Sequence, residues 1–317
     1  MRVLVTGSSG YLGVVVCEVL ARAGHDVRGL DVRRPPDPAQ TGVAIAFVEA
    51  SVTCLPELGQ ALAGCDGVVH LAGLSSDSAC RRQPTLARAI NLDASVALAR
   101  LAIAQGCRRF VHASSASVYG NLDTAPQPET ARPAPLSLYA RCKLEVEGRL
   151  NALIPEGLEP VHLRQATLFG WSPRLRTDLA VNAMTRDAVQ GRPIVIRGGG
   201  AQWRPFLHVR DAAHCLLAAL EAPTAAIRGE VFNVGGQDSN LRIRDVARIV
   251  SGVYPGTQVV SAPDRPERRS YRLDCAKVGA GLGWRPAMSV EDGVRELGEA
   301  LGAAEEGSAC YSWRSAR

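Results

Sequence analysis

The chain has 317 residues, of which 46% are hydrophobic and 21% are charged, a balance typical of a globular protein with a full-sized core. Its formal net charge is +5, and the basic residues form no long run interleaved with aromatics, so we expect no nucleic-acid partner. The nine cysteines form no CxxC pair and no zinc-type cluster, which predicts no metal site and a reducing, cytoplasmic location. No apolar run reaches about 18 residues, so we expect no membrane partner.

Short apolar strands alternate with helical stretches through the first half of the sequence. The predicted strands are Arg2–Thr6, Asp26–Leu30, Val43–Val48, Gly67–Leu71, Phe110–Ala113 and Val161–Phe169. The predicted helices are Gly10–Ala23, Leu55–Ala63, Pro84–Gln105 and Leu136–Leu153. Because the strands are almost continuously apolar, this alternation predicts an α/β fold with a doubly wound parallel sheet that helices cover on both faces.

The pattern loosens after Gly170. Further helices are predicted at Leu179–Gln190, Val209–Glu221, Ile243–Val250 and Val290–Leu301, and short strands at Ile194–Arg197 and Glu230–Val234. We interpret this half as a smaller C-terminal α/β substrate domain that closes over the binding edge of the sheet. The predicted organisation is residues 1–170 for the sheet domain, 171–302 mainly for substrate binding with some chain returning to the sheet domain, and 303–317 for a loose tail.

Three glycines, Gly7, Gly10 and Gly13, lie between the first predicted strand and the first predicted helix. They let the backbone turn tightly and approach a pyrophosphate, while the helix start offers free N–H groups and the positive end of its dipole. This loop directly follows an N-terminal strand, which indicates a Rossmann-type dinucleotide-binding domain, although its spacing is GxxGxxG rather than GxGxxG.

Asp31 closes the second predicted strand, 18 residues after Gly13. A carboxylate at this place accepts hydrogen bonds from both ribose hydroxyls of the adenosine half and repels a 2′-phosphate, which favours NAD over NADP. Arg33 and Arg34 follow closely and are able to tolerate that phosphate, so NADP stays open as the less favoured cofactor.

Tyr139 and Lys143 form a YxxxK spacing at the start of a predicted helix. Residues four apart share a helix face, so the phenol and the ammonium point the same way, and the lysine charge together with the positive nicotinamide ring should lower the pKa of Tyr139. The phenolate can then take a proton from a hydroxyl while hydride leaves its carbon. Ser115 follows the fifth predicted strand, where its hydroxyl can share that proton. The G-x-S-x-G elbow of acyl-transfer enzymes is absent.

His70 and Asn91 are two further polar residues of the first half. His70 ends an apolar strand, and we expect a packed residue rather than a base. Asn91 lies within the helix predicted at Pro84–Gln105, where two interpretations stay open. It either bridges the helix and the cofactor or lies on the surface.

Taken in order, these pieces resemble the extended short-chain dehydrogenase/reductase family, and within it the NAD-dependent nucleotide-sugar epimerases and dehydratases. The resemblance covers nearly the whole chain and is carried by TGSSGYLG, FVHASSASVYG, YARCK, LRQATLFG, GRPIVIRGGGAQWRPFLHVRDAA, EVFNVGG and DRPERR. It implies a Rossmann fold, NAD as cofactor and a nucleotide-diphosphate sugar as substrate. It also implies that Ser115, Tyr139 and Lys143 are the catalytic residues.

The same resemblance implies binding roles along the chain. The cofactor-binding residues would be Gly7, Ser9, Gly10, Tyr11, Leu12, Gly13, Asp31, Arg33, Ser51, Val52, Leu71, Ala72, Gly73, Ser75, Asn91, Ala113, Tyr139, Lys143, Gln165 and Ala166. The substrate-binding residues would be Ser115, Thr167, Ile196, Arg204 and Arg265. The two arginines would clamp the diphosphate through paired, charge-assisted bonds. Family members often pair through two helices, which implies a homodimer with a four-helix interface from residues 84–105 and 136–153.

The sequence departs from the family pattern at several positions. Ser51 stands where Asp is usual, and Thr167 stands where Asn is usual. Arg204-Pro205-Phe206 replaces Arg-Asp-Phe, and Arg265-Pro266-Glu267-Arg268 replaces RPGD. These departures leave the identity of the sugar and the base open.

The two residues after Ser115 distinguish reactions within the family. Members that remove water between C5 and C6 resemble one another in an acidic pair there, whereas this chain has Ala116-Ser117, which cannot protonate a leaving hydroxyl. We therefore favour reversible oxidation at C4, the reaction of a 4-epimerase. A ketoreductase of 4-keto sugars, a uronic acid decarboxylase and, from another class, a non-catalytic dinucleotide sensor stay open as alternatives.

Overall fold

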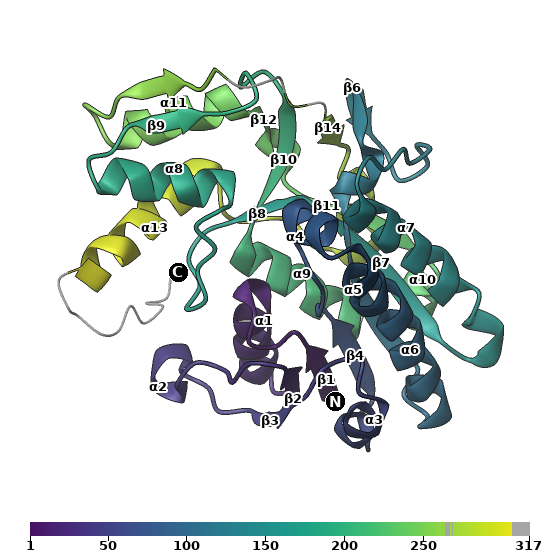
Figure 1. Ribbon diagram of the computed structural model, residues 1–317. Helices are drawn as coiled ribbons and strands as arrows, with labels where there is room; N and C mark the ends of the chain where they lie inside the picture. The colour runs from purple at the N-terminus through teal and green to yellow at the C-terminus, as the bar shows by residue number, and fades with distance from the viewer. Residues whose placement is uncertain (264–266, 268, 306–317) are drawn as a thin grey trace.

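The computed structural model describes residues 1–263, 267 and 269–305 (Figure 1). Its largest element is a seven-stranded sheet in the order β11-β7-β5-β4-β1-β2-β3, with every pair of neighbours parallel. The strands are β1 Arg2–Thr6, β2 Asp26–Asp31, β3 Ala46–Glu49, β4 Gly67–His70, β5 Arg109–Ser115, β7 Glu159–Gln165 and β11 Val231–Val234. The predicted α/β class with a doubly wound parallel sheet is confirmed.

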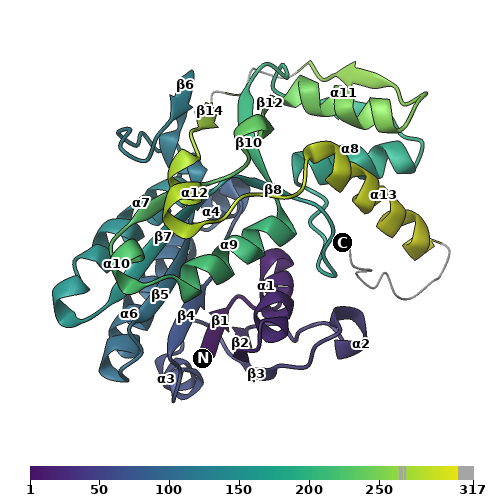
Figure 2. The same ribbon diagram turned by 180° about the vertical axis from the view of Figure 1, so that it is seen from behind.

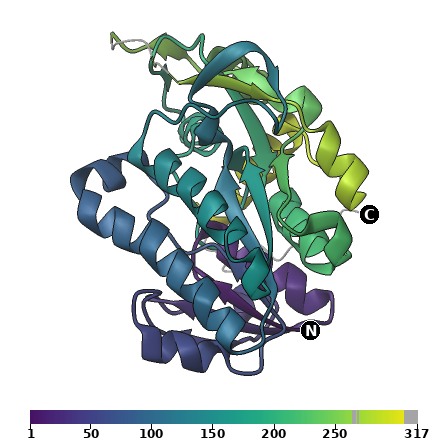
Figure 3. The same cartoon turned by 90° about the vertical axis from the view of Figure 1, so that its right-hand side faces the viewer.

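Helices cover both faces of this sheet (Figure 3). One face packs against α1 Tyr11–Arg22 and α9 Val209–Glu221, with the short helices α10 Thr224–Ile227 and α12 Ala276–Leu282 beside them. The other face packs against α3 Leu55–Leu62, α6 Ala94–Ala104 and α7 Leu138–Asn151. Each of these longer helices presents a stripe of apolar side chains to the strands, and burial of these stripes stabilises the layers. A short helix, α2 Pro38–Thr41, follows β2.

The helix predicted at Pro84–Gln105 is interrupted. It consists of α5 Pro84–Arg88, a π-helical turn at Ala89–Asp93, and α6. The wider turn contains Asn91, which is 1% exposed. Its Oδ1 accepts a hydrogen bond from the Leu74 N–H (2.8 Å), and its Nδ2 donates to the Leu74 carbonyl (3.2 Å). Asn91 therefore holds the loop after β4, and the surface interpretation is wrong.

The sixth predicted strand is two strands that separate at Ala166. β7 belongs to the large sheet, whereas β8 Thr167–Phe169 pairs with β10 Trp203–His208, which pairs in turn with β12 Asn240–Arg242. The chain thus passes from one sheet to another within one apolar run. Periodicity alone does not reveal such a break.

The second half of the chain builds a smaller α/β portion (Figure 2). Its core lies among α8 Ala180–Val189, α11 Ile243–Val253 and α13 Val290–Glu305. Two further strand pairs are β9 Ile194–Ile196 with β13 Val259–Ser261, and β14 Ser270–Leu273 with β6 Asn121–Gln127. Because β11 and α9 lie on the large sheet, the chain returns there after residue 170. The proposed boundaries at 170 and 302 stay predictions.

Candidate active site

A crevice of about 760 Å³ opens at the carboxyl ends of the parallel strands, near the point where the strand order reverses between β1 and β4. Open α/β sheets bind their ligands at this place. It brings together most residues that the sequence implicated in cofactor binding: Gly7, Gly10, Tyr11, Leu12, Gly13, Asp31, Arg33, Ser51, Val52, Leu71, Ala72, Gly73, Ser75, Ala113, Tyr139, Lys143 and Gln165.

The backbone of the glycine loop is so closely packed that added side chains would collide with backbone atoms. A Cβ atom at Gly13 would lie 2.0 Å from the Gly7 carbonyl oxygen, and Gly7 itself has φ +72°. No side chain caps the N-terminus of α1, so its first N–H groups face the crevice rather than a capping oxygen. Nearby, Gln165 Nε2 is buried with no hydrogen-bond partner among the described residues. The free backbone N–H groups fit the pyrophosphate of a dinucleotide, and the unpartnered Gln165 Nε2 fits its amide.

Replacing Gly13 by Ala should push α1 away from the loop, because the obstructing atom is backbone oxygen. We expect destabilisation of about 1–3 kcal/mol and a loss of bound dinucleotide. Chemical denaturation and the NAD released from purified protein by acid would measure both. Gly148→Ala in α7 is the matched control, since no atom lies within 4 Å of its added Cβ. Equal NAD content and stability in the two variants would contradict the prediction.

Asp31 is fixed at the end of β2. Its Oδ2 accepts a hydrogen bond from the Ser9 N–H and its Oδ1 accepts one from the Arg33 N–H, both at 3.1 Å. Arg34, which could have served a 2′-phosphate, pairs with Glu49 at 2.9 Å. The carboxylate is therefore pre-oriented toward the crevice, and one of the two neighbouring cations already has a partner.

The loop after β8 also lines the crevice, with Pro173, Arg174, Leu175 and Arg176, none of which the sequence had indicated. Arg174 donates to the Arg34 carbonyl (2.8 Å), and Arg176 donates to Ser75 Oγ (2.9 Å). The loop thus joins the segment after β2 to the segment after β4. No motif marks these residues, and the repeated arginines in a Pro-containing stretch are the only signal that could have suggested them.

Tyr139, Lys143 and Ser115 come together where α7 begins beside the end of β5. The Ser137 hydroxyl accepts a hydrogen bond from the Ala140 N–H (3.2 Å), so α7 begins directly before Tyr139. Lys143 Nζ donates to the Ala113 carbonyl (2.7 Å) and lies 5.9 Å from the centre of the Tyr139 ring. The Ser115 hydroxyl interacts with the phenol and lies 2.9 Å from Ser117 Oγ.

The electrostatics of this trio differ from the prediction. Desolvation raises the pKa of Tyr139 to about 12, while the Ser115 hydroxyl and the Arg176 guanidinium lower it by less. Burial also lowers the pKa of Lys143 to about 8. The predicted lowering of the Tyr139 pKa by Lys143 is therefore wrong for the chain alone, because removal from water outweighs the nearby charges.

A buried ion pair lies beside the elements that carry Tyr139, Lys143 and Ser115. Glu147, one turn after Lys143, is 4% exposed, and Arg164 on β7 is 5% exposed. Arg164 donates to both carboxylate oxygens of Glu147, at 3.1 and 2.7 Å. Ser114, next to Ser115, donates to the same carboxylate (2.5 Å). The pair therefore ties the end of β5 to the helix that carries Tyr139 and Lys143.

Other predicted residues lie outside the crevice. Ser9, Asn91 and Ala166 are buried in its supporting layer. His70 is fully buried between Thr6 and Ser95, 2.7 and 2.8 Å away, which confirms a packed residue. Ile196, predicted to contact substrate, instead packs in the core of the smaller portion.

The remaining predicted substrate residues are on or near the second sheet. Thr167 pairs through its backbone with β10. Arg204 donates to the carbonyls of Trp203 (2.8 Å) and Arg269 (2.5 Å) and stacks on Tyr271. Arg265 lies outside the described residues. Within the described ranges, the structure contains no cluster of metal ligands and no helix of the length and apolarity needed to cross a membrane.

Proteins similar to this chain include a 4-epimerase and a 4,6-dehydratase. UDP-glucose 4-epimerase of Mycolicibacterium smegmatis is 30% identical over 318 residues, covering 94% of this chain and 98% of that protein. dTDP-glucose 4,6-dehydratase of Streptomyces antibioticus is 28% identical, covering 93% of this chain and 90% of that protein. The chain is thus similar to nucleotide-sugar epimerases and dehydratases alike.

A solved structure of an epimerase has a similar overall fold. UDP-glucuronic acid 4-epimerase of Bacillus cereus, in complex with UDP-glucuronic acid and NAD, superposes with a TM-score of 0.83 at 26% identity, covering 96% of this chain and all of that chain. The model of the NAD dependent epimerase/dehydratase family matches residues 3–235. The predicted family and its cofactor, NAD, are confirmed by these matches, and the chain belongs to the NAD dependent epimerase/dehydratase family.

Proposed function

We propose that this chain is an NAD-dependent nucleotide-sugar 4-epimerase. The observation that carries the proposal is the convergence of Tyr139, Lys143 and Ser115 at the edge of a crevice built for a dinucleotide. Gly7, Gly10 and Gly13 would hold the pyrophosphate, and Asp31 the adenosine ribose. When bound, NAD supplies a reversible hydride acceptor at its nicotinamide ring.

Tyr139 is the group that moves the proton. Its phenolate form takes the proton of the C4 hydroxyl as that carbon is oxidised, and returns it when the carbon is reduced from the other face. Burial raises the pKa of Tyr139 in the chain alone, and the positive nicotinamide ring of bound NAD would, together with Lys143, favour the phenolate. The Ser115 hydroxyl hydrogen-bonds the reacting oxygen and orients it toward Tyr139. Lys143, held by the Ala113 carbonyl, keeps a cation near the phenol and stabilises the developing negative charge.

The residues after Ser115 support epimerisation over dehydration. Ala116 is 1% exposed and packs in the core, and the Ser117 hydroxyl is engaged by Ser115. Neither offers an acid to a leaving hydroxyl at C6. The non-acidic Ala116-Ser117 pair also disfavours the decarboxylase alternative.

The test is incubation of the purified protein with UDP-glucose or dTDP-glucose, without added cofactor, followed by NMR of the sugar. We expect the C4 epimer to form at the expense of substrate, because bound NAD is regenerated in each cycle. Stoichiometric oxidation of added NADH with a 4-keto sugar would instead indicate the ketoreductase. Absence of turnover with every nucleotide sugar would contradict both.

We also propose a homodimer that pairs through α5, α6 and α7. Their outer surface includes Arg88, Val96, Arg100, Glu145 and Arg149, which line a shallow cavity of about 340 Å³. A second copy would cover this surface with the same helices related by a twofold axis. Sedimentation of the purified protein measures this assembly directly.

A further inference from the structure

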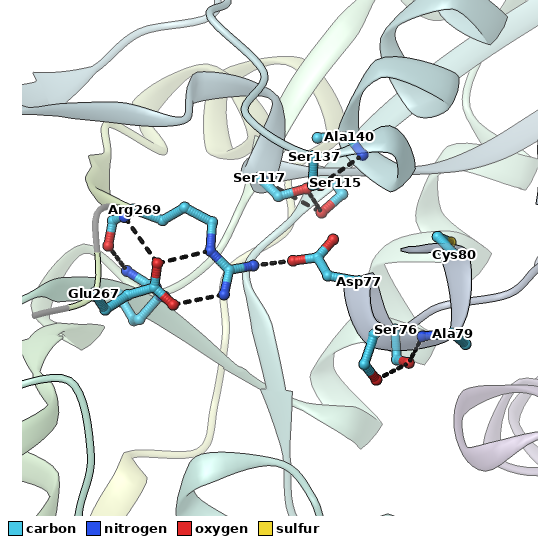
Figure 4. Close-up of polar contacts among 12 residues, drawn as sticks. Ser76, Asp77, Ala79, Cys80, Ser115, Ser117, Ser137, Ala140, Glu267 and Arg269 are labelled. Atoms are coloured by element: carbon cyan, nitrogen blue, oxygen red, sulfur yellow. Dashed lines mark hydrogen bonds and ion pairs between the residues drawn. The ribbon is translucent and has the colours of Figure 1, made fainter. Parts of the chain in front are cut away.

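Asp77 and Arg269 form an ion pair across a second cavity, of about 890 Å³, that both portions of the chain line (Figure 4). Asp77 is the first residue of α4 Asp77–Arg82, on the side of the large sheet. Arg269 directly precedes β14, beside the smaller portion. The pair therefore connects the two walls of the cavity.

Arg269 is held in place independently of Asp77. Its Nε and Nη2 donate to the two carboxylate oxygens of Glu267, at 3.1 and 2.6 Å, and its backbone N–H donates to the same group (3.0 Å). Arg204 donates to the Arg269 carbonyl (2.5 Å). Glu267 fixes the guanidinium and Arg204 fixes the backbone of Arg269, so Arg269 in turn fixes the direction in which the Asp77 carboxylate points.

The second oxygen of Asp77 has no partner. Oδ2 bonds Arg269, whereas Oδ1 is buried and accepts no hydrogen bond from any described residue. Burying a carboxylate oxygen without a donor is costly, and native structures usually satisfy such atoms with a ligand or water. In Figure 4 this oxygen points away from Arg269, on the side where Ser115 and Ser117 lie.

The cavity adjoins the reaction site. Leu138, directly before Tyr139, lines it, as does Ser137. Ser75, two residues before Asp77, lines the dinucleotide crevice. A sugar that places its C4 hydroxyl at Tyr139 would therefore extend toward Asp77.

We propose that Asp77 is a specificity-determining residue that accepts a hydrogen bond through Oδ1 from a hydroxyl or amino group of the sugar other than the C4 hydroxyl. This rests on the proposed function for the position of the sugar. An ionised carboxylate oxygen only accepts hydrogen bonds, so the unpartnered Oδ1 of Asp77 suits a hydroxyl or amino donor of the sugar. A sugar that lacks the donor leaves the oxygen unsatisfied and binds more weakly.

The experiment compares Kd values of the NAD-loaded protein for UDP-glucose and its 2-deoxy, 3-deoxy and 6-deoxy analogues. For the wild type, one analogue should bind about 10- to 100-fold more weakly than UDP-glucose, the range for a hydrogen bond to a charged group. Asp77→Ala should raise the Kd for UDP-glucose by a similar factor, so that UDP-glucose and that analogue have about the same Kd in this variant. Asp77→Asn keeps an acceptor and should retain part of the discrimination. Ser78→Ala, on the same helix and exposed, is the matched control and should behave like wild type.

The variant Arg269→Met tests whether Asp77 recognises the sugar or only joins the two walls of the cavity through its ion pair with Arg269. If Asp77 only joins the two walls, Asp77→Ala and Arg269→Met would weaken all four ligands equally, and the inference would be overturned. The same holds if Asp77→Ala leaves every Kd unchanged, or if the wild type binds neither UDP-glucose nor dTDP-glucose. Selective binding without C4 turnover would contradict the proposed function while supporting the role of Asp77.

Discussion

Replacing Tyr139 by Phe should lower kcat for C4 epimerisation by about 100- to 10,000-fold, the usual contribution of a positioned proton-transfer group. The phenyl ring fills the same space, so the fold and bound NAD should be retained. Lys143 and Ser115 remain in place, but neither can take the proton at the position of the lost oxygen. Initial rates measured by NMR, with the NAD content as a second readout, check the prediction.

Tyr254→Phe is the matched control for this substitution. Tyr254 directly follows α11 in the smaller portion and does not line the crevice, so its substitution should leave kcat within about twofold. A Tyr139→Phe protein that turns over within tenfold of wild type would show that another group moves the proton. Loss of bound NAD in this variant would show instead that Tyr139 acts mainly through cofactor binding.

Replacing Glu147 by Ala should destabilise the protein by about 3–5 kcal/mol, because it leaves the Arg164 guanidinium buried without its partner. Ser114 would lose its acceptor as well. Glu147 also raises the pKa of Lys143 against the larger effect of burial, so its loss should favour the neutral amine. The free energy of unfolding from urea titration measures the main effect.

Two comparisons make the result specific. Glu291→Ala in α13 breaks an exposed ion pair with Arg295, since the Glu291 side chain is 55% exposed, and should cost no more than about 1 kcal/mol. The double variant Glu147→Leu/Arg164→Met replaces both charges by apolar groups and should recover much of the stability. If Glu147→Ala costs no more than Glu291→Ala, the ion pair does not hold β5 against α7.

The sheet and the position of the crevice could be predicted because each rests on local sequence. Parallel strands buried on both faces read as apolar runs, and a glycine loop after the first strand places the binding edge. Gly7, Asp31 and Ser115 lie at the ends of different strands, yet the carboxyl ends of parallel strands share one edge of the sheet. The strand topology alone therefore predicts that these residues lie close together, although the sequence shows no contact between them.

Features that depend on packing between distant segments could not be predicted. The π-helical turn around Asn91 and the break at Ala166 leave the apolar pattern unchanged. Arg176 and Asp77 reach their places through loops whose course no motif records. The direction of the Tyr139 pKa shift in the chain alone was predicted wrongly, because desolvation depends on all the side chains around the phenol, which the YxxxK spacing does not show.

Because β11 joins the large sheet although it comes late in the chain, the first 170 residues cannot complete this sheet on their own. A ribosome that has released only the first 170 residues has produced a β7 whose outer edge is bare and an α1 that lacks the cover of α9. Unpaired strand edges and uncovered apolar helices invite aggregation, so the nascent chain has to be protected until the later segments emerge. Truncation at residue 170 is accordingly a poor route to an isolated nucleotide-binding fragment.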